Sequence, residues 1–186
     1  MVRPVDTRRR TLLTVLLAQL GALTFVLKMA MAGLPNIEPV SLLVMVFAVS
    51  LGWWGLAPVY LYVLLECVIW GVNSWSVCYL YVWLVLFLLA RLLRGLDGAL
   101  GWAVLSGAFG LFFSALCVPV YAAIGGWAYA LSWWVSGIPF DLLHCGGNFV
   151  LALVLFRPLR GLMDALLFRA GLKEPGERGG ADAPRR

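Results

Sequence analysis

Apolar residues in this chain gather into six segments, separated by short stretches that contain glycine, proline or polar residues. The segments cover residues 11–32, 39–51, 55–71, 77–93, 99–124 and 139–163. A helix that crosses a bilayer needs about 20 mostly apolar residues. The second and third segments are shorter, so we expect either a thinner bilayer there or helices that stop below the surface and line a cavity. The pattern predicts an all-α membrane protein with six transmembrane helices, with a tight helical hairpin at Gly52–Gly55.

The composition indicates a membrane protein rather than a soluble one. Hydrophobic residues make up 63% of the 186 positions and charged residues only 12%, with a mean hydropathy of +0.95. A soluble domain has about 25% charged residues. We therefore divide the chain into a basic N-terminus at 1–10, a membrane domain at 11–168 and a disordered tail at 169–186, the last because it is rich in Gly, Pro and charge. The first apolar segment is longer than the core of a secretory signal, which spans about 7–15 residues.

The positions of the basic residues predict the orientation. With both termini in the cytoplasm, 13 of the 14 Lys and Arg residues fall on the inside: Arg3, Arg8, Arg9, Arg10, Arg91, Arg94, Arg157, Arg160, Arg169, Lys173, Arg178, Arg185 and Arg186. The outer connections, near 33–38, 72–76 and 125–138, contain none. Cytoplasmic loops carry the excess of Lys and Arg. The location predicted is the plasma membrane of a prokaryote, with several membrane passes.

The remaining ionisable groups outside the cytoplasmic parts lie in the outer half of the membrane or at its outer edge. They are Lys28, Glu38, Glu66, Asp141 and His144. Such groups are costly in lipid, at about 2.5–3.5 kcal/mol for Lys or Asp on insertion scales, and therefore normally face a bundle interior or a wet cavity. Asp141, His144 and Asn148 share one helix face by their spacing. This pattern predicts a cavity that opens outward.

Aromatic and amide side chains extend the predicted cavity. Glu66, Trp70 and Asn73 share a face if the third helix continues that far, and Tyr79 and Trp83 share one on the fourth. The outer connections add Trp75, Trp127, Tyr129, Trp133 and Trp134. Aromatic walls with a few polar groups suit a small planar ligand. The predicted ligand-binding residues are Lys28, Glu66, Trp70, Asn73, Tyr79, Trp83, Asp141, His144 and Asn148.

Each of these residues also has a purely structural interpretation. Trp and Tyr are common at membrane interfaces whether or not a ligand binds. Lys28 can extend its amine outward to water, and Glu38 can lie in water beside Pro39. The polar groups of the last segment can form an internal salt-bridge or hydrogen-bond network. Both interpretations remain open at the level of the sequence.

Other kinds of site lack their residues. The four cysteines form no C-x-x-C pair, and one histidine does not build a zinc site of the usual kind. We therefore expect no metal and no cofactor. The basic residues are scattered along the chain, and we expect no nucleic-acid partner. A Gly-x-x-x-x-Gly-Lys-Ser/Thr phosphate loop is missing from the sequence, so any use of ATP requires a partner protein.

Several features together resemble the S-components, the substrate-binding subunits, of energy-coupling factor (ECF) vitamin transporters. The resemblance spans about residues 10–165. It rests on the six-segment plan, on Ala18-x-x-x-Ala22 in the first segment, on the connection Leu34-Pro35-Asn36-Ile37-Glu38-Pro39-Val40, and on the last segment with Phe140-Asp141, His144, Gly147-Asn148 and Arg157-Pro158-Leu159. The connection and the last segment are its more specific parts.

The resemblance implies a function. Such a subunit captures a vitamin or related nutrient outside the cell, docks on a transmembrane coupling subunit that carries two cytoplasmic ATPases, and delivers its ligand inside. It is a transport subunit rather than an enzyme. Ala18 and Ala22 then form the docking surface for the coupling subunit, and the first outer loop, with Pro35, Asn36 and Glu38, gates the pocket. The nutrient itself stays open among heteroaromatic vitamins, nucleobase derivatives and corrins.

Three other classes remain as alternatives. A structural or assembly membrane protein of similar helical layout would not need polar groups in the outer half of the bundle. An intramembrane enzyme could use Asp141 and His144 with Ser136, but Trp134 stands where a G-x-S motif needs glycine, and no H-E-x-x-H motif is present. A self-contained secondary transporter would typically contain an inverted repeat, and none is visible.

Overall fold

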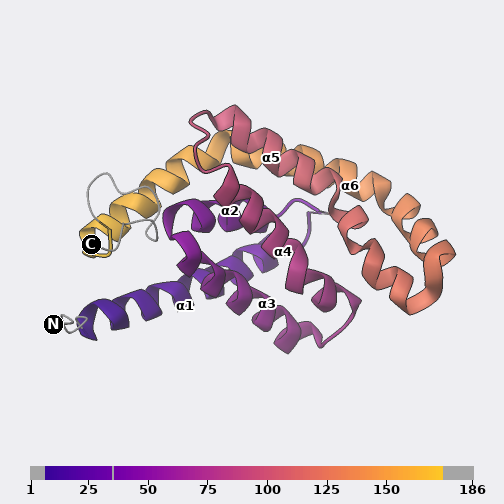
Figure 1. The fold of residues 1–186 in the computed structure, drawn as a ribbon, viewed down its shortest axis with the longest axis horizontal. Helices are drawn as coiled ribbons and strands as arrows, with labels where there is room; N and C mark the ends of the chain where they lie inside the picture. The colour runs from indigo at the N-terminus through magenta and orange to yellow at the C-terminus, as the bar shows by residue number, and fades with distance from the viewer. Residues whose placement is uncertain (1–6, 35, 174–186) are drawn as a thin grey trace.

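A computed structural model describes residues 7–34 and 36–173, and the ordered structure in these ranges is helical throughout, with no strand (Figure 1). The prediction of an all-α fold is confirmed for this part of the chain. The elements are α1 (Thr7–Ala30), α2 (Val40–Ser50), the 3-10 helix η1 (Gly52–Gly55), α3 (Leu56–Trp70), α4 (Ser74–Leu92), α5 (Ala99–Leu111) and α6 (Phe113–Arg169).

Four helical stretches are long and apolar enough to cross a membrane: Thr7–Ala30, Gly52–Trp70, Ser74–Leu92 and Ala99–Arg169. The last of them contains 71 residues and includes both α5 and α6. It reverses direction at Gly126, where φ is 79° and ψ is 173°, and Figure 1 shows the chain folding back there. Val40–Ser50 is apolar but shorter. A chain with several apolar helices of this kind has the architecture of a multi-pass membrane protein.

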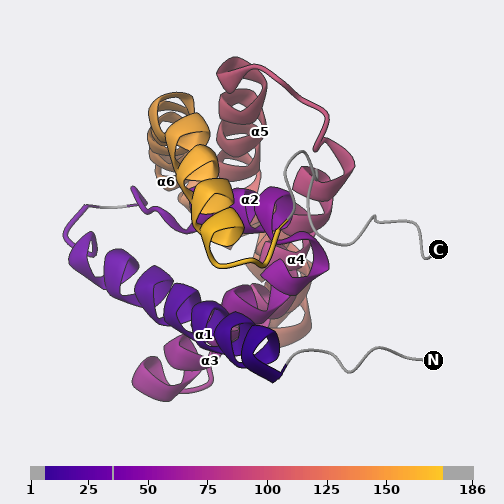
Figure 2. The ribbon, with the colours of Figure 1, turned by 90° about the vertical axis from the view of Figure 1, so that its left-hand side faces the viewer.

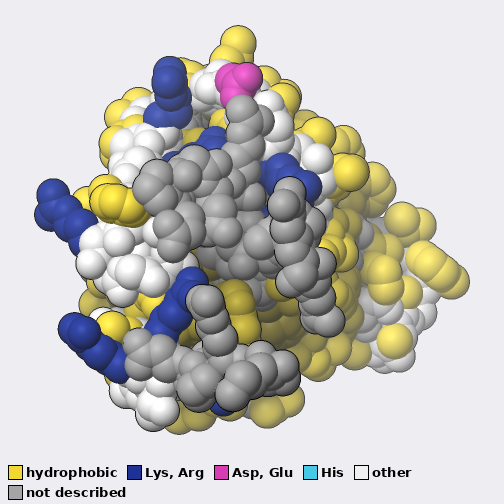
Figure 3. Space-filling view, turned by 60° about the vertical axis from the view of Figure 1, so that its left-hand side comes forward, with side chains coloured by type: hydrophobic (Ala, Val, Ile, Leu, Met, Phe, Trp, Pro, Cys, Tyr) yellow, Lys and Arg dark blue, Asp and Glu magenta, His cyan; other side chains and the backbone are white. Residues whose placement is uncertain are grey.

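The first and last described parts of the chain meet at one end of the molecule (Figure 2). There the Arg9 guanidinium donates a hydrogen bond to the Leu172 carbonyl at 3.2 Å, and Lys173 pairs with Asp164 at 2.7 Å. Figure 3 shows Lys and Arg side chains gathered at this end and hydrophobic side chains covering the flank beyond it. Ordered structure therefore continues to Lys173, five residues into the stretch expected to be a disordered tail; the rest of that stretch, 174–186, and residues 1–6 of the basic N-terminus lie outside the described residues.

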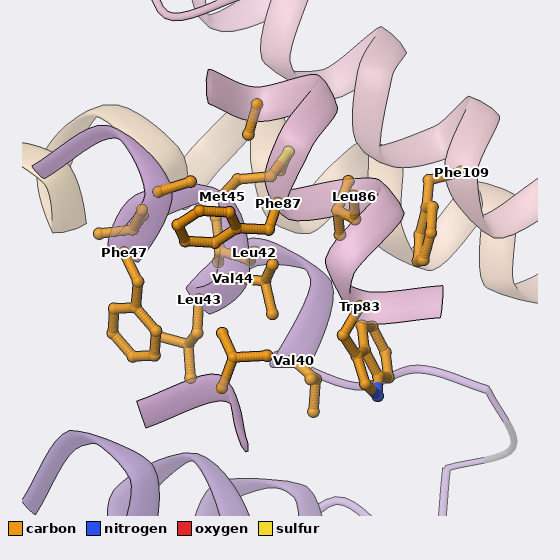
Figure 4. Close-up of a cluster of buried hydrophobic side chains, with 14 of the residues drawn as sticks. Val40, Leu42, Leu43, Val44, Met45, Phe47, Trp83, Leu86, Phe87 and Phe109 are labelled. Carbon is orange, nitrogen blue, oxygen red and sulfur yellow. The ribbon is translucent and has the colours of Figure 1, made fainter. Parts of the chain in front are cut away.

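Helix α2 forms the centre of the hydrophobic core. All of its residues are buried, and its side chains pack with Trp83, Leu86 and Phe87 of α4, while Phe109 of α5 extends the same cluster by contacting Trp83 (Figure 4). A helix that is apolar on every side is stable only inside a protein or a membrane. With 11 residues α2 is about 16 Å long, about half the thickness of a bilayer core. The short second segment is therefore a buried internal helix.

The turn after α2 is a tight hairpin, as predicted. Gly52 has a φ of 61°, and a Cβ on Gly55 would lie 2.6 Å from the Phe47 carbonyl oxygen. Neither position accepts a larger residue without strain. This hairpin directs α3 back alongside α1, where Gly21 packs directly on Leu61.

The fifth and sixth segments differ from the prediction. The expected helix over 99–124 is interrupted at Phe112, and the expected connection over 125–138 is helical except at Gly126. The boundary at 139 is therefore wrong, because residues 127–138 contain no proline and continue directly into the last helix. Pro119 and Pro139 both lie inside α6.

Small residues bring α5 close to α6. A Cβ on Gly107 would lie 3.3 Å from the Cys145 carbonyl oxygen, and one on Gly110 would lie 2.8 Å from the His144 carbonyl. Small residues such as these two glycines allow close packing of helices within a membrane. This close contact between α5 and α6 fixes the position of His144 along the bundle.

Candidate ligand-binding cavity

A cavity of about 870 Å³ lies at the end of α1 that is opposite its Arg-rich start. Along α1, Lys28 is about 30 Å from Arg8 at 1.5 Å per residue. The cavity is lined by Lys28, Met31, Ala32, Leu34, Asn36, Ile37, Glu38, Glu66, Trp70, Asn73, Trp75, Ser76, Tyr79, Phe113, Ser114, Trp133, Ser136, Gly137, Phe140 and His144. Its size is typical of sites for small molecules, which span about 300–1,000 Å³.

The ends of several helices bring the charged groups together. Lys28 is near the end of α1 and Glu66 near the end of α3, and their side chains form an ion pair at 2.7 Å. The Lys28 ammonium also lies 5.6 Å from the centre of the Tyr79 ring, within range of a cation–π interaction. The Lys28 side chain is 22% exposed and that of Glu66 is 8% exposed. Lys28 therefore points into the cavity and does not extend to the outer surface.

Glu38 and His144 lie next to each other in the lining of the cavity. The Glu38 Oε1 atom lies 3.9 Å from the His144 Nε2 atom, which is too long for a hydrogen bond. Burial raises the pKa of Glu38 from 4.5 to about 7, while the charge of Lys28 lowers it and that of Glu66 raises it. His144 is 3% exposed, and neither of its ring nitrogens has a hydrogen-bond partner among the described residues.

Aromatic rings form one wall of the cavity. The Trp75 ring centre lies 6.4 Å from that of Tyr79, 6.4 Å from that of Phe113 and 5.9 Å from that of Trp133. Phe113 also contacts His144, with ring centres 4.9 Å apart. Phe113 was not among the expected residues. No local signal identifies it, because its position depends on the helix break at Phe112.

The predicted polar face of the last helix divides between two roles. His144 lines the cavity, but Asp141 and Asn148 do not. The Asp141 carboxylate accepts hydrogen bonds from the Ser114 hydroxyl at 2.7 Å and the Ser114 amide at 3.2 Å. The Asn148 amide donates to the Ser41 hydroxyl at 3.0 Å and the Ser106 carbonyl at 3.3 Å. These two residues belong to an internal hydrogen-bond network, which was the alternative interpretation.

The other expected residues are also placed unequally. Trp70 and Tyr79 line the cavity, whereas Trp83 is fully buried in the core (Figure 4). Asn73 lines the cavity but shares no helix face with Glu66, because α3 ends at Trp70; its side chain caps α4 by accepting from the amides of Trp75 and Ser76. Of the aromatics expected from the outer connections, Trp75 and Trp133 line the cavity, and Trp127, Tyr129 and Trp134 do not.

The connection between α1 and α2 closes one side of the cavity. The Asn36 side chain donates to the Phe140 carbonyl at 3.1 Å, and Ile37 packs against Gly147. Both contacts fasten the connection to α6. Asn36 and Glu38 of the expected gating loop line the cavity, and Pro35 lies outside the described residues.

The two alanines of the first helix lie away from the cavity. Ala18 and Ala22 are exposed on α1, while Gly21 beside them is buried against α3. Their surface is free in the described structure.

In the described part of the chain, no group of three or more His, Cys, Asp or Glu side chains is placed to hold a metal, and all four cysteines are free thiols. No protein-family model matches the sequence, and neither a curated protein nor a solved structure matches it. The functional argument therefore rests on the fold and on the cavity.

Proposed function

We propose that this protein is the substrate-binding subunit of an ECF-type importer and captures a vitamin or related nutrient from outside the cell. The observation that carries the proposal is the cavity at the non-basic end, because it combines an aromatic wall with ionisable groups that would be costly in lipid. A purely structural membrane protein has no need for such a space. The resemblance of the first outer connection and the last helix to S-components supports the same class.

The proposed topology has six passes with both ends in the cytoplasm of a prokaryotic cell. The passes are α1, the short buried helix α2, which spans only about half of a bilayer core, η1 with α3, α4, residues 99–125 and residues 127–169. The basic end of the molecule then faces the cytoplasm, in agreement with the distribution of Lys and Arg in membrane proteins. The cavity opens toward the outside, and the connection with Asn36 and Glu38 acts as its gate.

Transport requires partners in this proposal: a transmembrane coupling subunit and two cytoplasmic ATPases. The exposed alanines of α1 provide the docking surface. Small residues on a helix allow close approach of a second helix within a bilayer. We expect Ala18→Trp and Ala22→Trp to prevent docking, and Leu23→Trp, on another exposed part of α1, to permit it.

The experiment that tests the proposal is purification from native membranes, followed by mass spectrometry of the proteins and small molecules that come with the chain. A coupling subunit, two ATPases and a vitamin-like molecule are the expected result. If the chain purifies without any ATPase from cells that contain such modules, and nutrient uptake is the same with and without it, the proposal is wrong.

An intramembrane enzyme receives less support from the geometry. Ser136 lines the cavity together with His144, but its hydroxyl donates to the carbonyls of Ser132 and Trp133, both at 2.9 Å. A serine nucleophile needs a base within hydrogen-bond reach. Turnover of a membrane substrate that disappears in His144→Ala would favour the enzyme.

A further inference from the structure

The charges of the cavity are not balanced, and this bears on the ligand. Lys28, Glu38 and Glu66 line it with His144. The single cation is already paired with Glu66 at 2.7 Å and covered on one side by the Tyr79 ring. No positive charge among the described lining residues remains for an anionic ligand, whereas the Glu38 carboxyl has no cation paired with it.

The cavity also has hydrogen-bond acceptors that no donor among the described residues satisfies. The Glu66 Oε1 atom is buried and accepts no hydrogen bond from the described residues. Both ring nitrogens of His144 also lack a hydrogen-bond partner there, and the Glu38 carboxyl lies 3.9 Å from Nε2, too far for a hydrogen bond. A buried acceptor without a donor costs about 1–3 kcal/mol, so these atoms are expected to be satisfied by a ligand or by water.

The gap between Glu38 and His144 is wide enough for one ligand nitrogen to hydrogen-bond to both residues. Its two atoms are 3.9 Å apart, so a ligand nitrogen can lie about 2.9 Å from each of them. A nitrogen with two N–H groups would fill the gap if Nε2 of the neutral imidazole is the acceptor. Close by, Phe113 and the other rings of the aromatic wall provide a surface against which a flat ring can stack.

We infer that the ligand is a planar aromatic or heteroaromatic molecule that presents N–H donors, as an amino or amidine-like edge, to Glu38, His144 and Glu66, and that it is cationic or neutral rather than a carboxylate or phosphate. Glu38 and His144 are then the residues that determine specificity. This inference rests on the proposed function, because it names the substrate class of the same cavity.

The test uses three probes of nearly equal shape: 2-naphthamidine, which is a cation, 2-naphthamide, which is neutral, and 2-naphthoate, which is an anion. The full chain is placed in phosphatidylcholine nanodiscs, and binding is followed by tryptophan fluorescence and by calorimetry. We expect the amidine to bind at least about tenfold more tightly than the naphthoate, with the amide between them; about tenfold corresponds to one charge-assisted hydrogen bond.

Two variants separate the cavity from general adsorption of a cation. Glu38→Gln removes the unpaired carboxyl and is expected to reduce the preference for the amidine about tenfold. Asp97→Asn makes the same acid-to-amide change in the exposed connection between α4 and α5, outside the cavity, and should leave the preference unchanged. Equal loss in both variants would show that the amidine binds to the surface, and would overturn the inference.

The inference is also overturned if the naphthoate binds as tightly as the amidine, or if the amidine shows no binding at millimolar concentration. These outcomes differ from a failure of the proposed function. If a carboxylate nutrient purifies with the chain and its ATPases, the inference of a ligand with N–H donors is wrong, while the proposed transport function is supported. If the chain binds the amidine but associates with no ATPase, the inferred ligand class is supported and the proposed transport function is not.

Discussion

The contact between Gly110 of α5 and His144 of α6 gives a sharp prediction about how the cavity is held in shape. A Cβ at position 110 would lie 2.8 Å from the carbonyl carbon and oxygen of His144 and 2.9 Å from the Cys145 nitrogen. All three are backbone atoms, so no side-chain rotation relieves the overlap. Ordinary contact begins at 3.4 Å, and Gly110→Ala must therefore separate the helices by about 0.6 Å.

Two opposing effects set the magnitude. Overpacking of this kind typically costs about 1–3 kcal/mol. Replacing glycine by alanine inside a helix stabilises the helix by up to about 1 kcal/mol. Gly146→Ala is a matched control, because it changes a helical glycine of α6 whose Cβ would meet nothing within 4 Å. The control keeps the gain in helix propensity without the overlap, so the difference between the variants isolates the cost of about 1–3 kcal/mol.

The assay is thermal unfolding of both variants in nanodiscs, followed by tryptophan fluorescence. For chains of about this length, 1 kcal/mol changes Tm by about 2–4 °C, so Gly110→Ala should melt roughly 2–12 °C below Gly146→Ala. Because the displaced backbone carries His144, amidine binding should weaken as well. Equal melting temperatures, within about 1 °C, would refute the close approach of α5 and α6 at this point.

Three further predictions concern the polar groups. Lys28→Met should destabilise the fold by about 2–4 kcal/mol because it leaves the buried Glu66 carboxylate unpaired. Adding Glu66→Gln should restore most of this loss when unfolding free energies are compared in a double-mutant cycle. Additive effects of the two substitutions would show that the residues do not form a pair. The folded-state pKa of Glu38, about 7, lies above its ordinary 4.5, so the folded protein holds a proton that the unfolded chain releases. The Tm of the wild type relative to Glu38→Gln should therefore fall as pH rises from about 5 to 8, by the equivalent of roughly 3 kcal/mol, and a flat difference would disprove the shift. Ser114→Ala should cost about 1–3 kcal/mol in chemical unfolding by removing the 2.7 Å hydrogen bond to Asp141, and a neutral result would place that carboxylate elsewhere.

The helices themselves could be predicted from the sequence because apolar runs bounded by glycine and charge identify them directly. The hairpin at Gly52–Gly55 followed from two glycines at the end of an apolar run. The short second segment left two alternatives, a thinner bilayer or a helix that stops below the surface and lines a cavity. Helix α2 is about 16 Å long, about half of a bilayer core, but it is buried in the hydrophobic core and does not line the cavity.

The region from 99 to 169 could not be predicted in the same way. Proline often bends or ends a helix, yet Pro119 and Pro139 both lie inside α6, and the breaks occur at Phe112 and Gly126. Phe112 carries no breaking signal of its own. Its backbone departs from helical geometry where the chain passes from α5 to α6, a change imposed by packing between helices that a single sequence does not record.

The cavity residues show the same limit at the level of side chains. Helical spacing correctly placed Asp141, His144 and Asn148 on one face, and all three are buried. The surroundings of this face change along the helix. Asp141 contacts Ser114, His144 lines the open cavity, and Asn148 contacts Ser41 and Ser106. Spacing along one helix describes a face but not its neighbours.

Unused hydrogen-bond capacity therefore distinguishes the binding candidates better than polarity does. Asp141 already has two donors from Ser114, so a ligand would have to break existing hydrogen bonds to reach it. His144 and Glu38 have none from the described residues, and binding a donor there gains hydrogen bonds without losing any. The free energy gained by a ligand depends on this difference. For that reason we expect Glu38 and His144, and not the more polar Asp141, to select what the cavity binds.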